Sequence, residues 1–209
     1  MTAGFVIAGT GTGIGKTVFA AALTRALDAA YWKPVQSGLD GETDSQAVAR
    51  LAGLPGGRVL PEAYRLALLA SPHMSAEREA IDIRAERLAL PVTSRPLIVE
   101  TAGGVLVPLS TRLLQIDMIA RWGLPVVLVA GTELGTINHS LLSLEALRAR
   151  AIPVHGVAFV GDAVEAVEQT IADLGRVRRL GRLPRIAALT PAKLADAFAR
   201  NFSVEDFRP

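Results

Sequence analysis

The chain has 209 residues, of which 50% are apolar and 20% are charged, and its 22 basic and 20 acidic residues leave a formal charge of +2. This composition excludes an intrinsically disordered chain, and the length suits one domain over residues 1–209 rather than two. The basic residues are spread among apolar ones, which indicates solvated faces rather than a surface for nucleic acid.

Short apolar runs bounded by glycine or proline alternate along the chain with longer segments of helical spacing. The runs predict strands and the longer segments predict helices. In chain order the expected elements are strand 5–8, helix 18–30, strand 31–33, a short helix after residue 44, strand 97–100, strand 126–130, helix 138–151, strand 156–160, helix 162–174 and a helix that begins at Thr190-Pro191.

This alternation predicts an α/β fold of the P-loop nucleotide-binding type, in which helices cover both faces of a mostly parallel sheet. Ligands of such sheets bind beyond the carboxyl ends of the strands. Residues 53–95 show no clear period and predict a loop-rich excursion. The last helix, with Leu194 and Phe198 on one face, is expected to dock on the core rather than on a membrane.

Cysteine is absent, which excludes disulfides, thiolate metal sites and thiol nucleophiles. The first residues enter an apolar strand directly and lack the basic start and cleavage site of a signal peptide. The longest strongly apolar run, residues 124–130, is far shorter than the roughly 20 residues that span a bilayer. We therefore expect a soluble cytoplasmic protein that binds neither membrane nor nucleic acid.

The strongest motif is Gly9-Thr10-Gly11-Thr12-Gly13-Ile14-Gly15-Lys16-Thr17, between a predicted strand and a predicted helix. Glycines let the backbone aim its N–H groups at phosphate oxygens, and a helix N-terminus favours an anion. Lys16 is predicted to reach the β- and γ-phosphates, and the Thr17 hydroxyl to ligate Mg²⁺. An NAD-binding loop is rejected because it needs neither side chain and because no acidic residue ends the second predicted strand.

Three more polar residues fall where the sheet would open its crevice, namely Lys33, Asp44 and Glu100. An ammonium at Lys33 would stabilise a transferred phosphoryl group, although an exposed strand-end lysine is the commoner explanation. Asp44 is explained equally well as a helix cap or as a metal ligand, and Thr43 could cap instead. Glu100 ends a buried strand, where many P-loop enzymes hold a second metal ligand.

Taken together, these segments resemble the dethiobiotin synthetase family over nearly the whole chain. The family's loop has the form Gly-Thr-x-Thr-x-x-Gly-Lys-Thr, and residues 9–17 fit it. The other matching segments, in the family's order, are Lys33-Pro34-Val35-Gln36-Ser37-Gly38, Asp44, Ser71-Pro72-His73, Glu100-Thr101-Ala102-Gly103-Gly104, Val107-Pro108-Leu109 and Leu134-Gly135-Thr136-Ile137-Asn138-His139. Several short motifs in the right order are much more specific than the loop alone.

The resemblance implies an ATP-dependent enzyme that forms a cyclic urea from 7,8-diaminononanoate and CO2, through a carbamate and its phosphorylated anhydride. It implies catalytic roles for Lys33 and Lys16, and Mg²⁺ ligands at Thr17, Asp44 and Glu100. The nucleotide-binding residues that it implies are Gly13, Ile14, Gly15, Lys16, Thr17, Val18, Asp44, Glu100, Thr101, Ala102, Gly103, Gly161, Asp162, Leu183, Pro184 and Arg185. The substrate-binding residues that it implies are Thr12, Lys33, Ser37, Thr136, Ile137 and Asn138.

The resemblance further implies a homodimer in which residues 135–138 contact the neighbour's substrate, so that Asn138 serves both there and as the cap of a helix. Three positions differ from the family's common pattern. Thr101 replaces a glycine and is expected to crowd a turn. Gly161 replaces an asparagine that contacts adenine, which predicts a weaker preference for that base, and Arg185 replaces an aromatic or small residue beside it.

Two other functions remain open at this point. An ATP-dependent dimerising switch of the partitioning or septum-positioning type shares the fold, but such proteins carry a second lysine at the start of the loop, where Gly9-Thr10 stand here. Another ligase that forms amides or ureas would share Lys16, Thr17 and Glu100 and would differ in its substrate pocket. ATP turnover that responds to lipid or DNA, and not to a diamine, would favour the switch.

Overall fold

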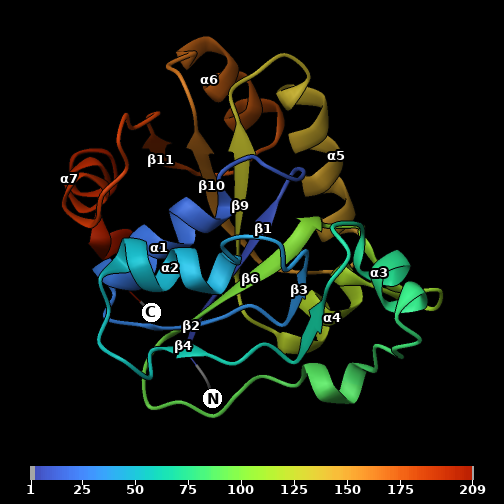
Figure 1. Ribbon diagram of the computed structural model, residues 1–209. Coiled ribbons are helices and arrows are strands. Elements are labelled where there is room, and N and C mark those ends of the chain that lie inside the picture. The colour runs from blue at the N-terminus through green and yellow to red at the C-terminus, as the bar shows by residue number, and fades with distance from the viewer. Residues whose placement is uncertain (1–2, 209) are drawn as a thin grey trace.

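A computed structural model describes residues 3–208, and in this range the main sheet has seven strands that all run parallel. Their order across the sheet is β11-β10-β9-β1-β6-β2-β4, which puts β1 in the middle (Figure 1). The strands are β1 Gly4–Gly9, β2 Ala30–Trp32, β4 Val59–Leu60, β6 Leu97–Gly104, β9 Val126–Gly131, β10 Val154–Val160 and β11 Arg179–Leu183.

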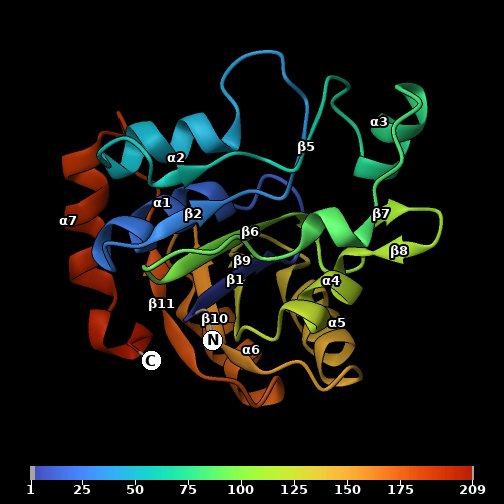
Figure 2. The same ribbon diagram turned by 90° about the horizontal axis from the view of Figure 1, so that it is seen from below.

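Helices cover both faces of this sheet, as Figure 2 shows when the molecule is seen from below. On one face lie α1 Lys16–Ala26, α2 Asp44–Ala52 and α7 Pro191–Asn201. On the other lie α4 Gln115–Trp122, α5 Thr136–Arg148 and α6 Glu165–Leu174. The remaining elements are β3 Val35–Ser37 paired with β5 Tyr64–Leu66, β7 Pro108–Ser110 paired with β8 Leu113–Leu114, α3 Pro72–Arg78, and the 3-10 turns η1 Ala85–Leu88 and η2 Val204–Phe207.

The central strands are apolar because both of their faces are buried. Successive side chains of a strand point to opposite faces, so Leu97 and Val99 of β6 join the core under α4 and α5 while Ile98 joins the core under α1. All three are fully buried. Glu100, two residues after Ile98, therefore faces the α1 side, which is where the loop after β1 delivers its functional groups.

The strand order reverses beside β1, and this places the glycine-rich loop at the ligand-binding edge. The chain leaves β1 through α1 for β2, on the far side of β6, whereas β9, β10 and β11 are added on the opposite side of β1. Loops at such a switch point diverge and leave a crevice beyond the carboxyl ends of the strands. Residues 10–15 occupy this position.

The predicted fold class is confirmed, with differences in particular elements. Strand β11 and helix α4 are absent from the sequence-based expectations. Strand β11 lacks an apolar run, because Arg179, Gly181 and Arg182 interrupt its leucines. The 53–95 excursion is loop-rich as expected and holds only β4, β5, α3 and η1. Thr190 caps α7 as predicted, since its side chain accepts from the backbone N–H of Lys193. No helix within residues 3–208 is long and apolar enough to cross a membrane.

A buried carboxylate fastens β11 to the neighbouring helix α6. Glu168 is fully buried, and its Oε2 accepts from Nε of Arg179 at 2.9 Å, while its Oε1 lies 2.9 Å from Nε of Arg182 as a charge pair without hydrogen-bond alignment. Breaking a buried ion pair from one side leaves uncompensated charge.

We expect Glu168→Gln to lower the free energy of unfolding by about 2–4 kcal/mol, because both guanidinium groups lose their shared anion. Urea denaturation followed by circular dichroism measures the change. The control Glu205→Gln removes a carboxylate from an exposed pair with Arg208 and should change the value by less than about 1 kcal/mol. Equal, small effects of the two substitutions would contradict a stabilising role for Glu168.

Candidate functional site

The loop between β1 and α1, residues 10–15, contains two glycines in the left-handed backbone conformation. Gly13 and Gly15 have φ values of +74° and +93°, which residues with a side chain rarely adopt. A Cβ at Gly15 would also collide with Val160 at the end of β10. Lys16 is buried, and its Nζ donates to the carbonyl of Gly11 at 2.7 Å. The Lys16 ammonium is therefore bonded to the backbone of its own loop.

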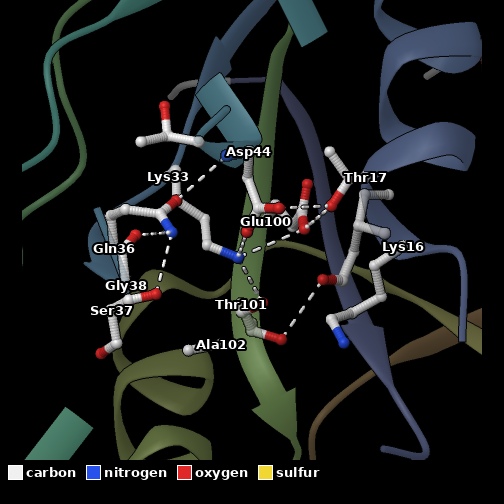
Figure 3. A network of polar contacts seen from close by, with 12 residues as sticks. Lys16, Thr17, Lys33, Gln36, Ser37, Gly38, Asp44, Glu100, Thr101 and Ala102 are labelled. Atoms are coloured by element: carbon white, nitrogen blue, oxygen red, sulfur yellow. Dashed lines mark hydrogen bonds and ion pairs between the residues drawn. The ribbon is translucent and has the colours of Figure 1, made fainter. Parts of the chain in front are cut away.

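Four charged or hydroxyl side chains meet beside this loop (Figure 3). The Lys33 Nζ lies 2.7 Å from Oδ2 of Asp44 and 3.2 Å from Oε1 of Glu100. The Thr17 Oγ1 lies 2.9 Å from Oδ1 of Asp44 and 2.8 Å from Oε1 of Glu100, so its single proton can go to either carboxylate. The three residues predicted from separate segments therefore form one cluster with the first residues of α1.

Local structure accounts for the position of Asp44. Thr43 caps α2, with its side chain accepting from Gln46 and the Gln46 side chain accepting from the Thr43 backbone in return. The backbone N–H of Asp44 donates to Oε1 of Gln36 at 3.2 Å. The Asp44 carboxylate therefore does not cap the helix and instead contacts Lys33 and Thr17. Of the two explanations for Asp44 given by the sequence, the structure excludes the cap.

Mutual charge neutralisation sets the protonation of this cluster. Burial alone would lower the pKa of Lys33, but the carboxylates of Glu100 and Asp44 outweigh burial and hold the pKa above its ordinary value. Burial would raise the pKa of Asp44, and Lys33 holds it below its ordinary value instead. Burial and the neighbouring Lys33 charge lower the pKa of Lys16 to about 8. The two carboxylates therefore favour the charged form of Lys33, whereas burial and Lys33 disfavour the charged form of Lys16.

The oxygen donors of this cluster suit Mg²⁺. Among residues 3–208 no group of three or more histidine, cysteine, aspartate and glutamate side chains could hold a metal ion. The Thr17 hydroxyl nevertheless lies within 2.9 Å of both carboxylates. Such a set matches the few oxygen ligands by which proteins hold Mg²⁺, which keeps water and phosphate oxygens in its other positions. The donor set thus fits a metal ion shared with a nucleotide phosphate.

A cavity of about 790 Å³ opens on this cluster. Residues of the loop, of β3, of the end of β6 and of the segment before α3 line it, including Thr12, Lys16, Lys33, Ser37 and Gly103. Such a volume lies in the usual range for sites that enclose a small molecule. Both lysines and both carboxylates therefore line one cavity.

Comparison with known proteins places this site in a family. A profile described as an AAA domain matches residues 3–193. A protein of Rhodopseudomonas palustris named ATP-dependent dethiobiotin synthetase is 61% identical over 207 residues, which cover 99% of this chain and 97% of that protein. A protein of Agrobacterium fabrum with the same name is also 61% identical, over 99% of this chain and 98% of its own length. The chain belongs to the dethiobiotin synthetase family.

A solved structure of a ParA family ATPase from Chlorobium tepidum superposes with a TM-score of 0.55 over 98% of this chain and 92% of its own. At 10% identity this likeness shows the fold alone. Family membership decides between the readings left open by the sequence: the chain is an ATP-dependent ligase of the dethiobiotin synthetase family, and the partitioning-type switch shares only its architecture.

Several residues expected from the dethiobiotin synthetase resemblance line the cavity. Thr12, Gly13, Gly15, Lys16, Thr17, Val18, Lys33, Ser37, Asp44, Glu100, Ala102 and Gly103 all do so. Ile14 instead packs, partly buried, against the core under α1. Ser37 Oγ is buried and has no hydrogen-bond partner among residues 3–208, as a group reserved for a ligand would be. The assignment of individual roles within this set remains a prediction.

Thr101 does not occupy a turn, contrary to the expectation from its glycine-bearing relatives. Strand β6 continues to Gly104, so Thr101 is extended and buried within it. Its hydroxyl donates to the carbonyl of Ile7 in β1 at 3.3 Å, and its own carbonyl accepts from Lys33 at 3.2 Å. The side chain therefore crowds nothing, and the backbone of Thr101 helps to hold the Lys33 ammonium.

The segment predicted to flank the base lies beyond β10 and β11, outside the cavity. Gly161 has a φ of +141°, and a Cβ there would overlap the Thr132 hydroxyl, so this chain cannot place asparagine at the position without local change. Arg185 pairs with Asp162 at 3.2 Å and with Glu133. Leu183, by contrast, is fully buried, and its side chain belongs to the core.

The start of α5 differs from the sequence-based prediction. The helix begins at Thr136 with Gly135 as its cap at a φ of +95°, so the prediction that Asn138 caps the helix is wrong. Glycine adopts this left-handed conformation without strain, which moves the start forward. Thr136 is buried and its hydroxyl donates to the carbonyl of Gly131 at 2.7 Å, whereas Asn138 is exposed. None of residues 136–138 lines the cavity of the single chain.

Proposed function

We propose that the cluster beside the loop performs the three steps of dethiobiotin formation, with Mg-ATP as the phosphoryl donor. An amine of 7,8-diaminononanoate adds to CO2 and loses a proton, which gives a carbamate. A carbamate oxygen takes the γ-phosphoryl group and ADP leaves. The second amine attacks the carbonyl carbon, the C–O bond to phosphate breaks, and the cyclic urea remains with phosphate released.

The observation that carries this proposal is the convergence of Lys16, Lys33 and two carboxylates on one cavity. Negative charge gathers on the carbamate and on the transferred phosphoryl group, so two ammonium groups facing that space lower the barrier by charge stabilisation and positioning. Lys33 serves the carbamate and its phosphorylation, and Lys16 binds the phosphates. No covalent bond to the protein is required.

Thr17, Asp44 and Glu100 are proposed to hold Mg²⁺, which would bridge phosphate oxygens and offset their charge when bound. The loop residues 13–18 hold the phosphates by their N–H groups. Residues 161–162 and 183–185 flank the base. Because Gly161 carries no amide, base selection rests on the surrounding backbone and on Arg185, which predicts a weak preference for adenine.

A homodimer completes this proposal. Thr12 and Ser37 contact the substrate from within one chain, whereas Thr136, Ile137 and Asn138 reach the substrate of a second subunit. Support comes from the position of residues 136–138, which lie outside the cavity of their own chain. The first turn of α5 would suit the carboxylate of the substrate. A cytoplasmic location of the enzyme agrees with the absence of cysteine from its sequence.

We expect phosphate release from Mg-ATP to require both the diamine and bicarbonate, with a product that carries one added urea carbonyl. Coupled phosphate detection and mass spectrometry measure the two quantities on one sample. Phosphate release that ignores the diamine would remove the proposed substrate while leaving nucleotide hydrolysis. Equal rates with ATP, CTP and GTP would agree with the altered base segment, whereas strict use of ATP would contradict our account of Gly161.

A further inference from the structure

The Glu100 carboxylate is held from two sides, and one of its partners is a tyrosine buried in the core. Its Oε1 faces Thr17 at 2.8 Å and Lys33 at 3.2 Å. Its Oε2 accepts a hydrogen bond from the hydroxyl of Tyr31 at 2.8 Å. Among residues 3–208, Tyr31 is the single hydrogen-bond donor to Oε2, whereas Thr17 and Lys33 donate to Oε1.

Strand pairing produces this arrangement. Tyr31 of β2 lies opposite Ile98 of β6, and Trp32 lies opposite Val99, so the same register brings Lys33 opposite Glu100. Tyr31 and Lys33 are two residues apart in an extended segment, and their side chains therefore leave it on the same face. One reaches Glu100 from the core side and the other from the cavity side.

The torsion that orients a glutamate carboxylate is soft, because rotation between an sp³ carbon and an sp² carbon has broad minima. A carboxylate held on one oxygen alone can turn about its axis. Tyr31 is fully buried in the hydrophobic core under α1, which restricts the position of its hydroxyl. Because a carboxylate oxygen accepts hydrogen bonds, the Tyr31 hydroxyl is the donor in this contact.

We propose that Tyr31 is a positioning residue that locks the Glu100 carboxylate, so that Oε1 is presented to the divalent cation of the site. The inference rests on the proposed metal role of Glu100 and extends it to a residue outside the cavity. Partners behind metal-ligating side chains typically change metal affinity by about 10- to 100-fold when removed. A tyrosine that served only the core would have no such influence.

The test is Tyr31→Phe, which keeps the ring and removes the hydroxyl. Mn²⁺ binding is measured by electron paramagnetic resonance in the presence of a non-hydrolysable ATP analogue, and analogue binding is measured separately with EDTA. We expect Mn²⁺ affinity to fall about 10- to 100-fold, analogue affinity without metal to stay the same, and the KM for the diamine to stay within about twofold. Higher Mn²⁺ should restore turnover.

A matched control exists, because the chain has two tyrosines. The Tyr64 hydroxyl accepts from the backbone of Arg84 and donates to that of Asp82, far from Glu100 in the hydrogen-bond network. Tyr64→Phe should leave Mn²⁺ affinity unchanged. Unchanged affinity in Tyr31→Phe, or an equal loss in both variants, would overturn the positioning role. A wild-type protein that binds no Mn²⁺ with the analogue would instead refute the metal site in the proposed function.

Discussion

Replacing Lys33 by glutamine should abolish formation of the cyclic urea while leaving nucleotide binding largely intact. The Lys33 ammonium lies between Asp44 and Glu100 at the cavity wall, and its high pKa keeps it charged through the neutral range. Glutamine retains an N–H donor but loses the charge that stabilises the carbamate and the transferred phosphoryl group. Loss of one such electrostatic group commonly costs about 10²- to 10³-fold in kcat.

Turnover is measured by phosphate release with diamine and bicarbonate, and nucleotide affinity by calorimetry with a non-hydrolysable analogue. Lys193→Gln is the matched control, since Lys193 is exposed on α7 and its Nζ donates to the carbonyl of Ala187. It should behave as the parent in both assays. Turnover in Lys33→Gln equal to that of the parent would remove Lys33 from the mechanism.

Replacing Lys16 by methionine should reduce nucleotide affinity about 10- to 100-fold and should reduce turnover with it. This differs from Lys33→Gln, in which nucleotide binding should stay largely intact. A charge-assisted hydrogen bond to phosphate accounts for about 1.5–3 kcal/mol, and methionine keeps the length of the side chain without the charge. Because the pKa of Lys16 is lowered to about 8 without ligand, only the protonated fraction is ready for an anion.

The lowered pKa of Lys16 determines how nucleotide affinity changes with pH. Below pH 8 Lys16 is charged before the nucleotide arrives, whereas above pH 8 binding must take up a proton, so affinity in the parent should decline as pH rises. Calorimetry at pH 8.5 in two buffers of different ionisation enthalpy reports this uptake. Lys16→Met should lack both the uptake and the decline. A variant that bound nucleotide as tightly as the parent would show that the backbone N–H groups alone suffice.

Sequence and structure agree best where residues act locally. The spacing within residues 9–17 predicts a loop, the start of a helix and the positions of Lys16 and Thr17, and all of these features lie within one short segment. Lys33, Asp44 and Glu100 could be assigned to one crevice because the carboxyl ends of parallel strands meet at one edge. Their contacts confirm that juxtaposition, although their chemical roles remain predictions.

Features that depend on partners distant in sequence escaped prediction. Tyr31 reads as an ordinary strand residue until the register of β2 against β6 shows what its hydroxyl touches; its spacing of two from Lys33 was the available signal. Strand β11 depends on the buried Glu168, which neutralises arginines that would otherwise argue for a surface loop. Gly161 needed the position of Thr132 before its lack of a side chain could be explained.

The ion pairs around Lys33 also explain how two lysines and two carboxylates can lie close together at the wall of one cavity. Lys16, Lys33, Asp44 and Glu100 sum formally to zero charge, so in the free protein these groups act as counterions of one another. A buried charge without such a partner is costly. In the proposed function, a cation at the carboxylates and anions at the lysines would therefore replace these internal counterions with external ones. The same ion pairs would then stabilise the fold between turnovers.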